Sequence, residues 1–161
     1  MDLTKMYDIQ KGLMAKIDKK HPADGEDRSA KKFVGMLTEF AECINEHRGF
    51  KFWSNDQEPR EELLEEYVDG IHWILEHGID YGFRVEQNYT LINEIENIEI
   101  QFIECIYWAV TFFKNPTDQN YSVLFAAYLG LGNMFGFSTD LIESAYMEKN
   151  EINHNRQDNS Y

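Results

Sequence analysis

Two pairs of acidic residues, each spaced three positions apart, are the residues of this sequence best suited to chemistry. Glu39 and Glu42 form one pair, and Glu66 and Asp69 form the other. Residues three apart on a helix are neighbours one turn away, so each pair places two like charges side by side. A shared cation relieves that repulsion, and Mg²⁺ prefers carboxylate oxygens as ligands. The spacing therefore predicts a magnesium site built by carboxylates from two consecutive helices, with two or more ions.

Two other interpretations of these acidic residues stay open. An acidic helix face can simply be solvated, which is common in a chain with a formal charge of −14. A di-iron centre is the other inorganic option, but it usually needs two Glu-x-x-His steps, and only Asp69 and His72 come close to that spacing. Trp73 on the same predicted face, and Gly35 one turn before Glu39, favour a built site.

Gln10 lies within an apolar helical stripe, where its amide needs hydrogen-bond partners. The amide could pair with the adjacent donor and acceptor on the edge of a pyrimidine such as uracil. Partners on a neighbouring helix, or water, are the alternative.

Two further segments could contact a nucleotide. In GFKFWS, aromatic rings alternate with a lysine, so Trp53 could stack on a base and Lys51 could contact a phosphate. An aromatic loop that closes the end of a core gives the same pattern. At the end of this acidic chain, Lys149, Asn153 and Arg156 gather hydrogen-bond donors that could bind phosphate oxygens. A solvated terminus is the alternative.

The elements that position these residues are helices. Apolar residues recur every three or four positions, no run alternates strictly as in a strand, and the three prolines fall between periodic segments. We expect an all-α bundle of about six helices with a four-helix core. The helices are predicted near residues 2–18, 27–48, 59–77, 88–114, 118–136 and 138–150. Their ends are marked by Asp2 and Asp118 as N-caps, Pro59 in a first turn, Gly78 after a C-terminus and Ser138 before the last helix.

The composition predicts one globular domain, residues 1–161, because 43% of the residues are hydrophobic. The formal charge of −14 argues against nucleic acid as a partner, since duplexes are bound mainly through Lys and Arg. An acidic protein that acts on nucleotides must reverse the local charge with a divalent cation. We expect no secretion signal and no membrane span, and Cys43 and Cys105 fit buried thiols in a reducing, cytoplasmic setting.

The segment IQFIECIYWAVTFF is apolar on nearly all sides, whereas a surface helix of a small monomer needs only one apolar stripe. Burial in a homodimer interface and a central position in a monomeric bundle both fit this pattern.

In sequence order these segments resemble the dimeric, all-α dUTP diphosphatases of bacteria and their phages, relatives of the MazG-like NTP pyrophosphohydrolases. The resemblance covers almost the whole chain. It is carried by DIQKGL with Gln10, by EFAECINEHRGFKFWS with Glu39 and Glu42, by LLEEYVDGIH with Glu65, Glu66 and Asp69, and by the tail KNEINHNRQDNSY.

The resemblance implies a MazG-like bundle that acts as a homodimer and hydrolyses dUTP, and also dUDP, to dUMP with magnesium. Pyrophosphate would leave dUTP after attack at the β-phosphorus. The implied magnesium ligands are Glu39, Glu42, Glu66 and Asp69, the implied uracil contacts are Gln10 and Trp53, and the implied phosphate contacts are Lys51, Lys149, Asn153 and Arg156. We assign Glu39 to orienting or deprotonating the water, because a carboxylate beside the metal can lie within about 3 Å of that water. The tail, residues 150–161, would close over the active site. Its last part, residues 151–161, is poorly helical by itself and needs a partner surface.

The sequence departs from the family pattern at two places. Leu13 stands one turn after Gln10, where some relatives have a second polar contact to the base, and NSY stands where a glycine is expected before the tyrosine. Two other functions are therefore kept as alternatives. One is a related pyrophosphohydrolase for another dNTP, and the other is a non-catalytic helical dimer that binds a partner protein.

Overall fold

The computed structural model describes residues 1–85 and 97–159, and that part of the chain contains six helices and no strand. The helices are α1 Leu3–Lys20, α2 Ser29–His47, α3 Leu63–Tyr81, α4 Ile98–Lys114, α5 Asp118–Met134 and α6 Thr139–Asp158. The predicted all-α bundle of about six helices is confirmed. None of the helices in the described ranges has the length and apolar character needed to cross a bilayer.

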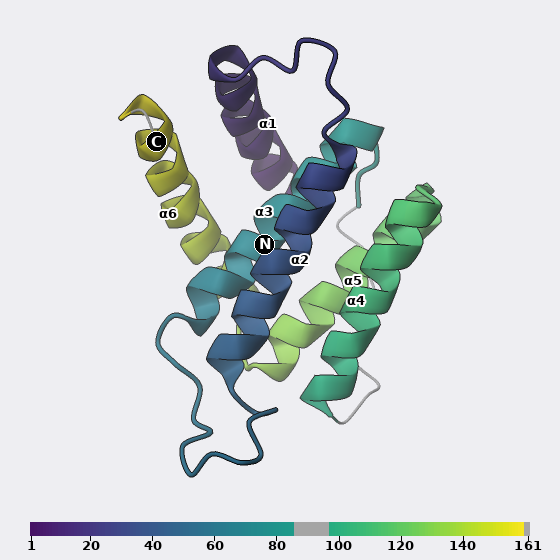
Figure 1. Ribbon diagram of the computed structural model, residues 1–161. Coiled ribbons are helices and arrows are strands. Elements are labelled where there is room, and N and C mark those ends of the chain that lie inside the picture. Colours follow the sequence, from purple (N-terminus) through teal and green to yellow (C-terminus); the bar gives the residue numbers. More distant parts are fainter. Residues whose placement is uncertain (86–96, 160–161) are drawn as a thin grey trace.

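Helix α3 is the central element of the bundle. It packs against α1, α2, α5 and α6, while α4 pairs with α5 and also contacts α2. In Figure 1, α1 and α6 lie on one side of the α2–α3 pair, and α4 and α5 lie on the other. Tyr67, Ile71 and Ile74 of α3 are completely buried. Because so much of its surface packs against other helices, α3 holds its polar face in a fixed position between α2 and α6.

The contact between α3 and α5 is fixed by a reciprocal pair of tyrosines. The Tyr67 hydroxyl donates to the Tyr128 carbonyl at 3.2 Å, and the Tyr128 hydroxyl donates to the Tyr67 carbonyl at 3.1 Å. Each ring reaches across the partner helix beside a glycine. A Cβ on Gly70 would lie 2.0 Å from the Tyr128 hydroxyl oxygen, and one on Gly132 would lie 2.3 Å from that of Tyr67. The two glycines therefore allow the helix backbones to approach closely enough for both hydrogen bonds.

The helix ends agree with the sequence prediction in part. Asp2 accepts a hydrogen bond from the backbone of Lys5, and Ser138 accepts one from the backbone of Leu141, so both predicted N-caps are confirmed. The prediction for Asp118 is wrong. Thr117, one residue earlier, is the N-cap of α5 and accepts from the Asn120 backbone, because its extended backbone leaves its hydroxyl facing the first turn.

Helix α3 is shifted towards the C-terminus relative to the prediction of 59–77. It begins at Leu63, so Pro59 precedes the helix, and it continues through Gly78 to Tyr81. Gly82, with a φ of 74°, ends the helix in the left-handed conformation that glycine adopts at little cost. Gly78 is buried inside the helix, where packing outweighs the intrinsic preference of glycine for helix ends.

Helix α6 is longer than the predicted range of 138–150, because residues 151–158 continue the helix. The partner surface that this segment needs is α1. The Lys16 ammonium donates to the His154 carbonyl at 2.9 Å and forms an ion pair with Asp158 at 2.7 Å. These contacts hold the last two turns of α6 against α1, so tertiary contacts override the poor local helix propensity of this segment.

Helix α4 begins at Ile98, with Asn97 as its N-cap. The earlier part of the predicted helix 88–114 falls within 86–96, which lie outside the described residues. The two cysteines, Cys43 and Cys105, are free and fully buried, as expected.

Gly35 of α2 lies where the indole ring of Trp73 crosses from α3. A Cβ on Gly35 would lie 2.6 Å from Cζ2 and 2.7 Å from Cη2 of that ring, which is closer than packed atoms can approach. The absence of a side chain at this position therefore allows Trp73 to pack against α2.

We predict that Gly35→Ala destabilises the protein although alanine favours helix. The clash should cost about 1–3 kcal/mol, against a gain of about 1 kcal/mol in helix propensity. Gly12→Ala in α1 is the matched control, because nothing lies within 4 Å of its Cβ position. Urea denaturation should show opposite signs for the two substitutions. Equal stabilisation by both would contradict the proposed packing.

His77 of α3 is 3% exposed, and its Nε2 has no hydrogen-bond partner among the described residues. Burial lowers its pKa to about 4, so the folded protein favours the neutral ring. Below the ordinary pKa of 6.5 the unfolded chain therefore binds the extra proton, and stability is lost as the pH falls from 6.5 towards 4.

We predict that His77→Gln removes this contribution. Between pH 7.5 and pH 5, the free energy of unfolding of the unmodified protein should fall by about 2 kcal/mol more than that of the variant. Denaturation curves of both proteins at the two pH values measure this difference directly. The same pH dependence in both proteins would show that His77 does not contribute.

Candidate functional site

Three of the four predicted magnesium ligands lie together between α2 and α3. Glu39, Glu42 and Glu66 each offer a carboxylate oxygen, and these atoms all lie within 4.8 Å of one another. The i, i+3 spacing of Glu39 and Glu42 places both on the side of α2 that faces α3. Three carboxylates therefore share a small volume, and none of the three forms an ion pair within residues 1–85 and 97–159.

The electrostatics of this cluster are those of crowded carboxylates. Burial and the charges of Asp69 and Glu42 together raise the pKa of Glu39 to about 7, although a hydrogen bond from Trp73 opposes the shift. Burial and the same two charges also raise the pKa of Glu66. The raised pKa values of Glu39 and Glu66 show that each carboxylate lies where its negative charge is disfavoured. A cation bound between them would compensate that charge.

Asp69, the fourth predicted ligand, already has a cationic partner. Its carboxylate forms an ion pair with the Lys149 ammonium of α6 at 2.7 Å, and the same ammonium also binds Glu65. Burial lowers the pKa of Lys149, but the bonds to the two carboxylates outweigh that effect, so the net shift is upwards. Lys149 is thus a cation beside the cluster that neutralises only one edge of it.

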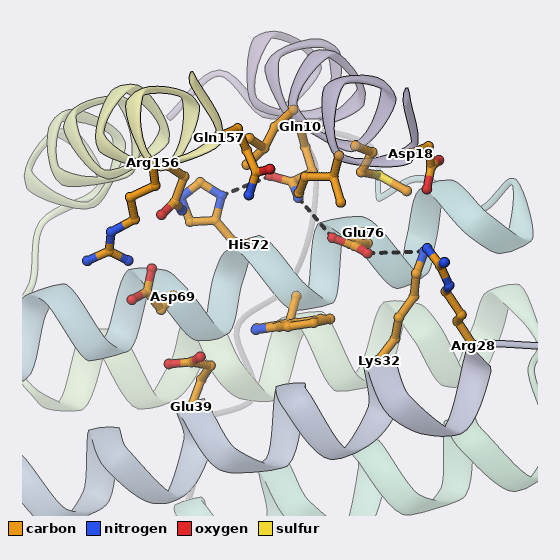
Figure 2. A pocket seen from close by; sticks show the side chains of 15 residues that line it. Gln10, Asp18, Arg28, Lys32, Glu39, Asp69, His72, Glu76, Arg156 and Gln157 are labelled. Atoms are coloured by element: carbon orange, nitrogen blue, oxygen red, sulfur yellow. Dashed lines mark hydrogen bonds and ion pairs between the residues drawn. The ribbon is translucent and has the colours of Figure 1, made fainter. Parts of the chain in front are cut away.

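A cavity of about 360 Å³ opens beside Glu39 and Asp69. Helices α1, α2, α3 and α6 each contribute one stripe of residues at helical spacing. The stripes are Gln10, Leu13, Met14 and Ile17 of α1, Arg28, Lys32 and Glu39 on and before α2, Asp69, His72, Trp73 and Glu76 of α3, and Asn153, Arg156 and Gln157 of α6. Figure 2 shows Arg156, Asp69 and Glu39 at one end of this cavity, and Gln10, Glu76 and Lys32 towards the other. Its volume falls within the range of small-ligand sites.

Gln10 is 1% exposed and is fully engaged by protein groups on its carbonyl side. Its Oε1 lies 2.8 Å from Nδ1 of His72 and 3.0 Å from the Tyr146 hydroxyl, and its Nε2 donates to Glu76 at 3.3 Å. The alternative expectation, that the Gln10 amide finds its hydrogen-bond partners on neighbouring helices, is therefore confirmed. Two lone pairs of the carbonyl and one N–H are used, so one N–H of the amide remains.

His72 is a neutral imidazole in this environment. Burial and the charge of Lys149 together lower its pKa to about 3, although the Tyr146 carbonyl opposes the shift. Its ring stacks on that of Tyr146 at 4.0 Å, and its Nε2 has no hydrogen-bond partner within the described part of the chain. His72 therefore adds polarity to the cavity without adding charge.

The remaining predicted residues divide into two groups. Asn153 and Arg156 line the cavity, as expected for phosphate contacts. Lys51 and Trp53 do not, because they lie on the α2–α3 connection. The Lys51 ammonium donates to the Asn45 carbonyl at 3.3 Å, and Trp53 is 66% exposed. Contact of Lys51 and Trp53 with a nucleotide therefore stays a prediction, because neither side chain lines the cavity of this single chain.

Among the lining residues that were not predicted as site residues, Lys32, His72 and Glu76 interact with Gln10 or with its partners. A signal for two of them was available, because Asp69, His72 and Glu76 follow at i, i+3 and i+7 on one helix face. Extending the acidic face of α3 by one turn would have included both. Lys32 carried no comparable signal, since its partner Glu76 is distant in sequence.

The arrangement suits a divalent metal and a phosphorylated ligand. The clustered carboxylates supply hard oxygen ligands in a net negative site, which fits Mg²⁺ better than a softer ion. Cationic and amide groups on α6 face the same end of the cavity. The opposite end offers an enclosed, partly apolar space with a buried amide, as a flat base would need.

A family model described as dUTPase matches residues 2–161 and supports this interpretation. The comparison with curated proteins gave no match. The family match extends over nearly the full chain, including all four helices that line the cavity, and the helical architecture is that of the all-α type. The chain therefore belongs to the dUTPase family of the all-α type, a family of dUTP-hydrolysing enzymes.

Proposed function

We propose that this chain hydrolyses dUTP, and also dUDP, to dUMP in a magnesium-dependent reaction that releases pyrophosphate from dUTP. The observation that carries the proposal is the juxtaposition of Glu39, Glu42 and Glu66 with a cavity of about 360 Å³. Uncompensated carboxylates beside a site of nucleotide size are expected where a cation and a polyphosphate bind together.

The proposed ligands of two or more magnesium ions are Glu39, Glu42, Glu66 and Asp69. Bound magnesium would neutralise phosphate charge and make a coordinated water more acidic. Three of these carboxylates already share a volume, and Asp69 lines the cavity next to them. Asp69 would have to exchange at least part of its ion pair with Lys149 for a metal. That exchange would free the Lys149 ammonium to contact a phosphate oxygen.

Within the chain, Glu39 is suited to orient or deprotonate the attacking water. It both belongs to the cluster and lines the cavity, so it would face bound ions and substrate together. Without a cation its pKa is raised, and bound magnesium would favour the ionised carboxylate, the form that can accept a proton from water. An in-line attack at the β-phosphorus would then leave dUMP and pyrophosphate.

Phosphate oxygens not reached by magnesium would contact α6. Asn153 and Arg156 line the cavity, and Arg156 lies at the same end as Asp69. Burial raises the pKa of the Asp69 carboxyl, and the charge of Arg156 is close enough to oppose that shift. In this scheme the last turns of α6, residues 150–158, close the site. Lys51 and Trp53 would reach a nucleotide only after movement of their loop or through a second copy of the chain.

The proposed active form is a homodimer in a reducing cytoplasm. Helix α4 exposes an apolar stripe of Ile100, Ile103 and Tyr107, which are 49%, 62% and 57% exposed. Val34 of α2, which packs against α4, is 61% exposed. Contiguous exposed apolar side chains on a soluble domain favour an interface, and a second copy would cover them. Both cysteines are buried free thiols, which fits a reducing setting.

We predict that Glu39→Gln lowers turnover of dUTP by at least about 100-fold, the usual contribution of a general base. The variant should retain its helix content by circular dichroism and, without magnesium, should be more stable than the unmodified protein by roughly 1 kcal/mol, because one like charge is removed. Pyrophosphate release from dUTP measures turnover, and denaturation in EDTA measures stability.

Glu46→Gln is the matched control, since Glu46 lies on the same helix but outside the carboxylate cluster. It should leave turnover unchanged. Normal turnover in the Glu39 variant would refute its assignment. A panel of dUTP, dTTP, dCTP and UTP identifies the substrate, and preference for another dNTP would favour the related pyrophosphohydrolase instead. No turnover and no thermal shift with Mg²⁺ would favour a non-catalytic dimer.

We predict that Ile103→Asp weakens the dimer, because it buries a charge in the proposed interface. Sedimentation velocity should show a shift to monomer at micromolar concentrations. Leu141→Asp is the control, since Leu141 is 43% exposed but lies on α6, away from α4. A monomeric unmodified protein, or equal effects of both variants, would argue against this interface.

A further inference from the structure

The Gln10 side chain begins a partly buried hydrogen-bond chain that runs from α1 through α3 to α2. Its Nε2 donates to Oε2 of Glu76 at 3.3 Å, and the other oxygen of Glu76 lies 3.1 Å from the Lys32 ammonium. Figure 2 shows these three side chains in line along one end of the cavity. The chain is separate from the cluster of Glu39, Glu42 and Glu66.

The partners of Gln10 leave its amide only one orientation. An ionised carboxylate can only accept hydrogen bonds, so Glu76 must face the amide nitrogen. The amide oxygen then faces Nδ1 of His72 at 2.8 Å and the Tyr146 hydroxyl at 3.0 Å, both of which can donate. After a rotation of 180° the amide nitrogen could still donate to Nδ1 of His72 and to the Tyr146 hydroxyl, which itself reaches the Met6 carbonyl at 3.3 Å, but the amide carbonyl would oppose the carboxylate of Glu76. Glu76 is therefore the partner that decides the orientation. Consequently the group that remains for a ligand is an N–H.

Lys32 favours the ionised form of Glu76, which can only accept hydrogen bonds. The side chain of Glu76 is 14% exposed, and its burial raises the pKa of its carboxyl, which favours the protonated form that could donate. The Lys32 ammonium opposes this by pairing with Glu76, and it also pairs with Asp80 at 2.6 Å. Both carboxylates therefore share one ammonium, but only Glu76 touches Gln10.

We propose that Glu76, paired with Lys32, is a positioning residue for base selection, because it fixes the Gln10 amide so that an N–H faces the base. This inference rests on the proposed function, in which the base occupies the cavity. A donor at this point pairs with a carbonyl of uracil and opposes the exocyclic amino group of cytosine. Thymine has the same carbonyls as uracil, so this device separates uracil from cytosine and not from thymine.

The test compares kcat/KM for dUTP, dCTP and dTTP in the unmodified enzyme and in three variants. In Glu76→Gln the new amide can donate or accept, so Gln10 is no longer held in one orientation. The dUTP to dCTP ratio should fall about tenfold, mainly through a higher KM for dUTP. The dUTP to dTTP ratio should stay unchanged. Lys32→Gln, at a side chain that is 21% exposed, should lower the dUTP to dCTP ratio as well, because Glu76 loses the cation that favours its ionised form.

Asp80→Asn is the matched control, because it removes a carboxylate from the same ammonium without touching Gln10. It should keep the dUTP to dCTP ratio of the unmodified enzyme. An unchanged dUTP to dCTP ratio in both Glu76→Gln and Lys32→Gln would overturn the inference. An equal loss of kcat/KM for all three nucleotides would also overturn it, because Glu76 would then have only a structural role. If the unmodified enzyme itself does not prefer dUTP to dCTP, the proposed function fails, and the inference fails with it.

Discussion

The close approach of like-charged carboxylates between α2 and α3, held against their mutual repulsion, is the constraint on which the candidate site depends. Glu39, Glu42 and Glu66 are held within 4.8 Å of one another although each disfavours the charge of the others. The adjoining face of α2 carries Met36 and Phe40, which are completely buried. Burying a large apolar side chain contributes about 1.5–3 kcal/mol, whereas a like-charge pair on a helix costs a few tenths. Core packing therefore keeps a cation site assembled that would separate if electrostatics acted alone.

Helix α3 connects this cluster to the rest of the site. Along one face it carries Asp69 beside the cluster, then His72 at mid-cavity, and finally Glu76 beside Gln10. A single rigid element thus sets the distance between the end that would bind phosphates and the end that would bind a base. The tyrosine pair with α5 and the long contact with α2 hold this helix in register. Small shifts of α3 would therefore disturb both ends of the site together.

Much of this could be predicted from the sequence, because helical periodicity is a local property. The acidic pairs, the buried position of Gln10 and the helical class follow from spacing alone. Long-range pairing does not. The order of residues 151–158 depends on Lys16, more than a hundred positions earlier, and the capture of Asp69 depends on Lys149. The orientation of the Gln10 amide likewise depends on partners from two other helices, α3 and α6, which no local pattern reveals.

The most direct measurement is anomalous diffraction from crystals grown with Mn²⁺, which occupies oxygen-ligand sites of the magnesium type, and a non-hydrolysable dUTP analogue. The predicted result is anomalous density between Glu39, Glu42 and Glu66, with Asp69 turned towards it and the analogue's phosphates adjacent. Crystals in which the analogue is bound but no anomalous density lies among these carboxylates would contradict the assignment of this cluster as the metal site.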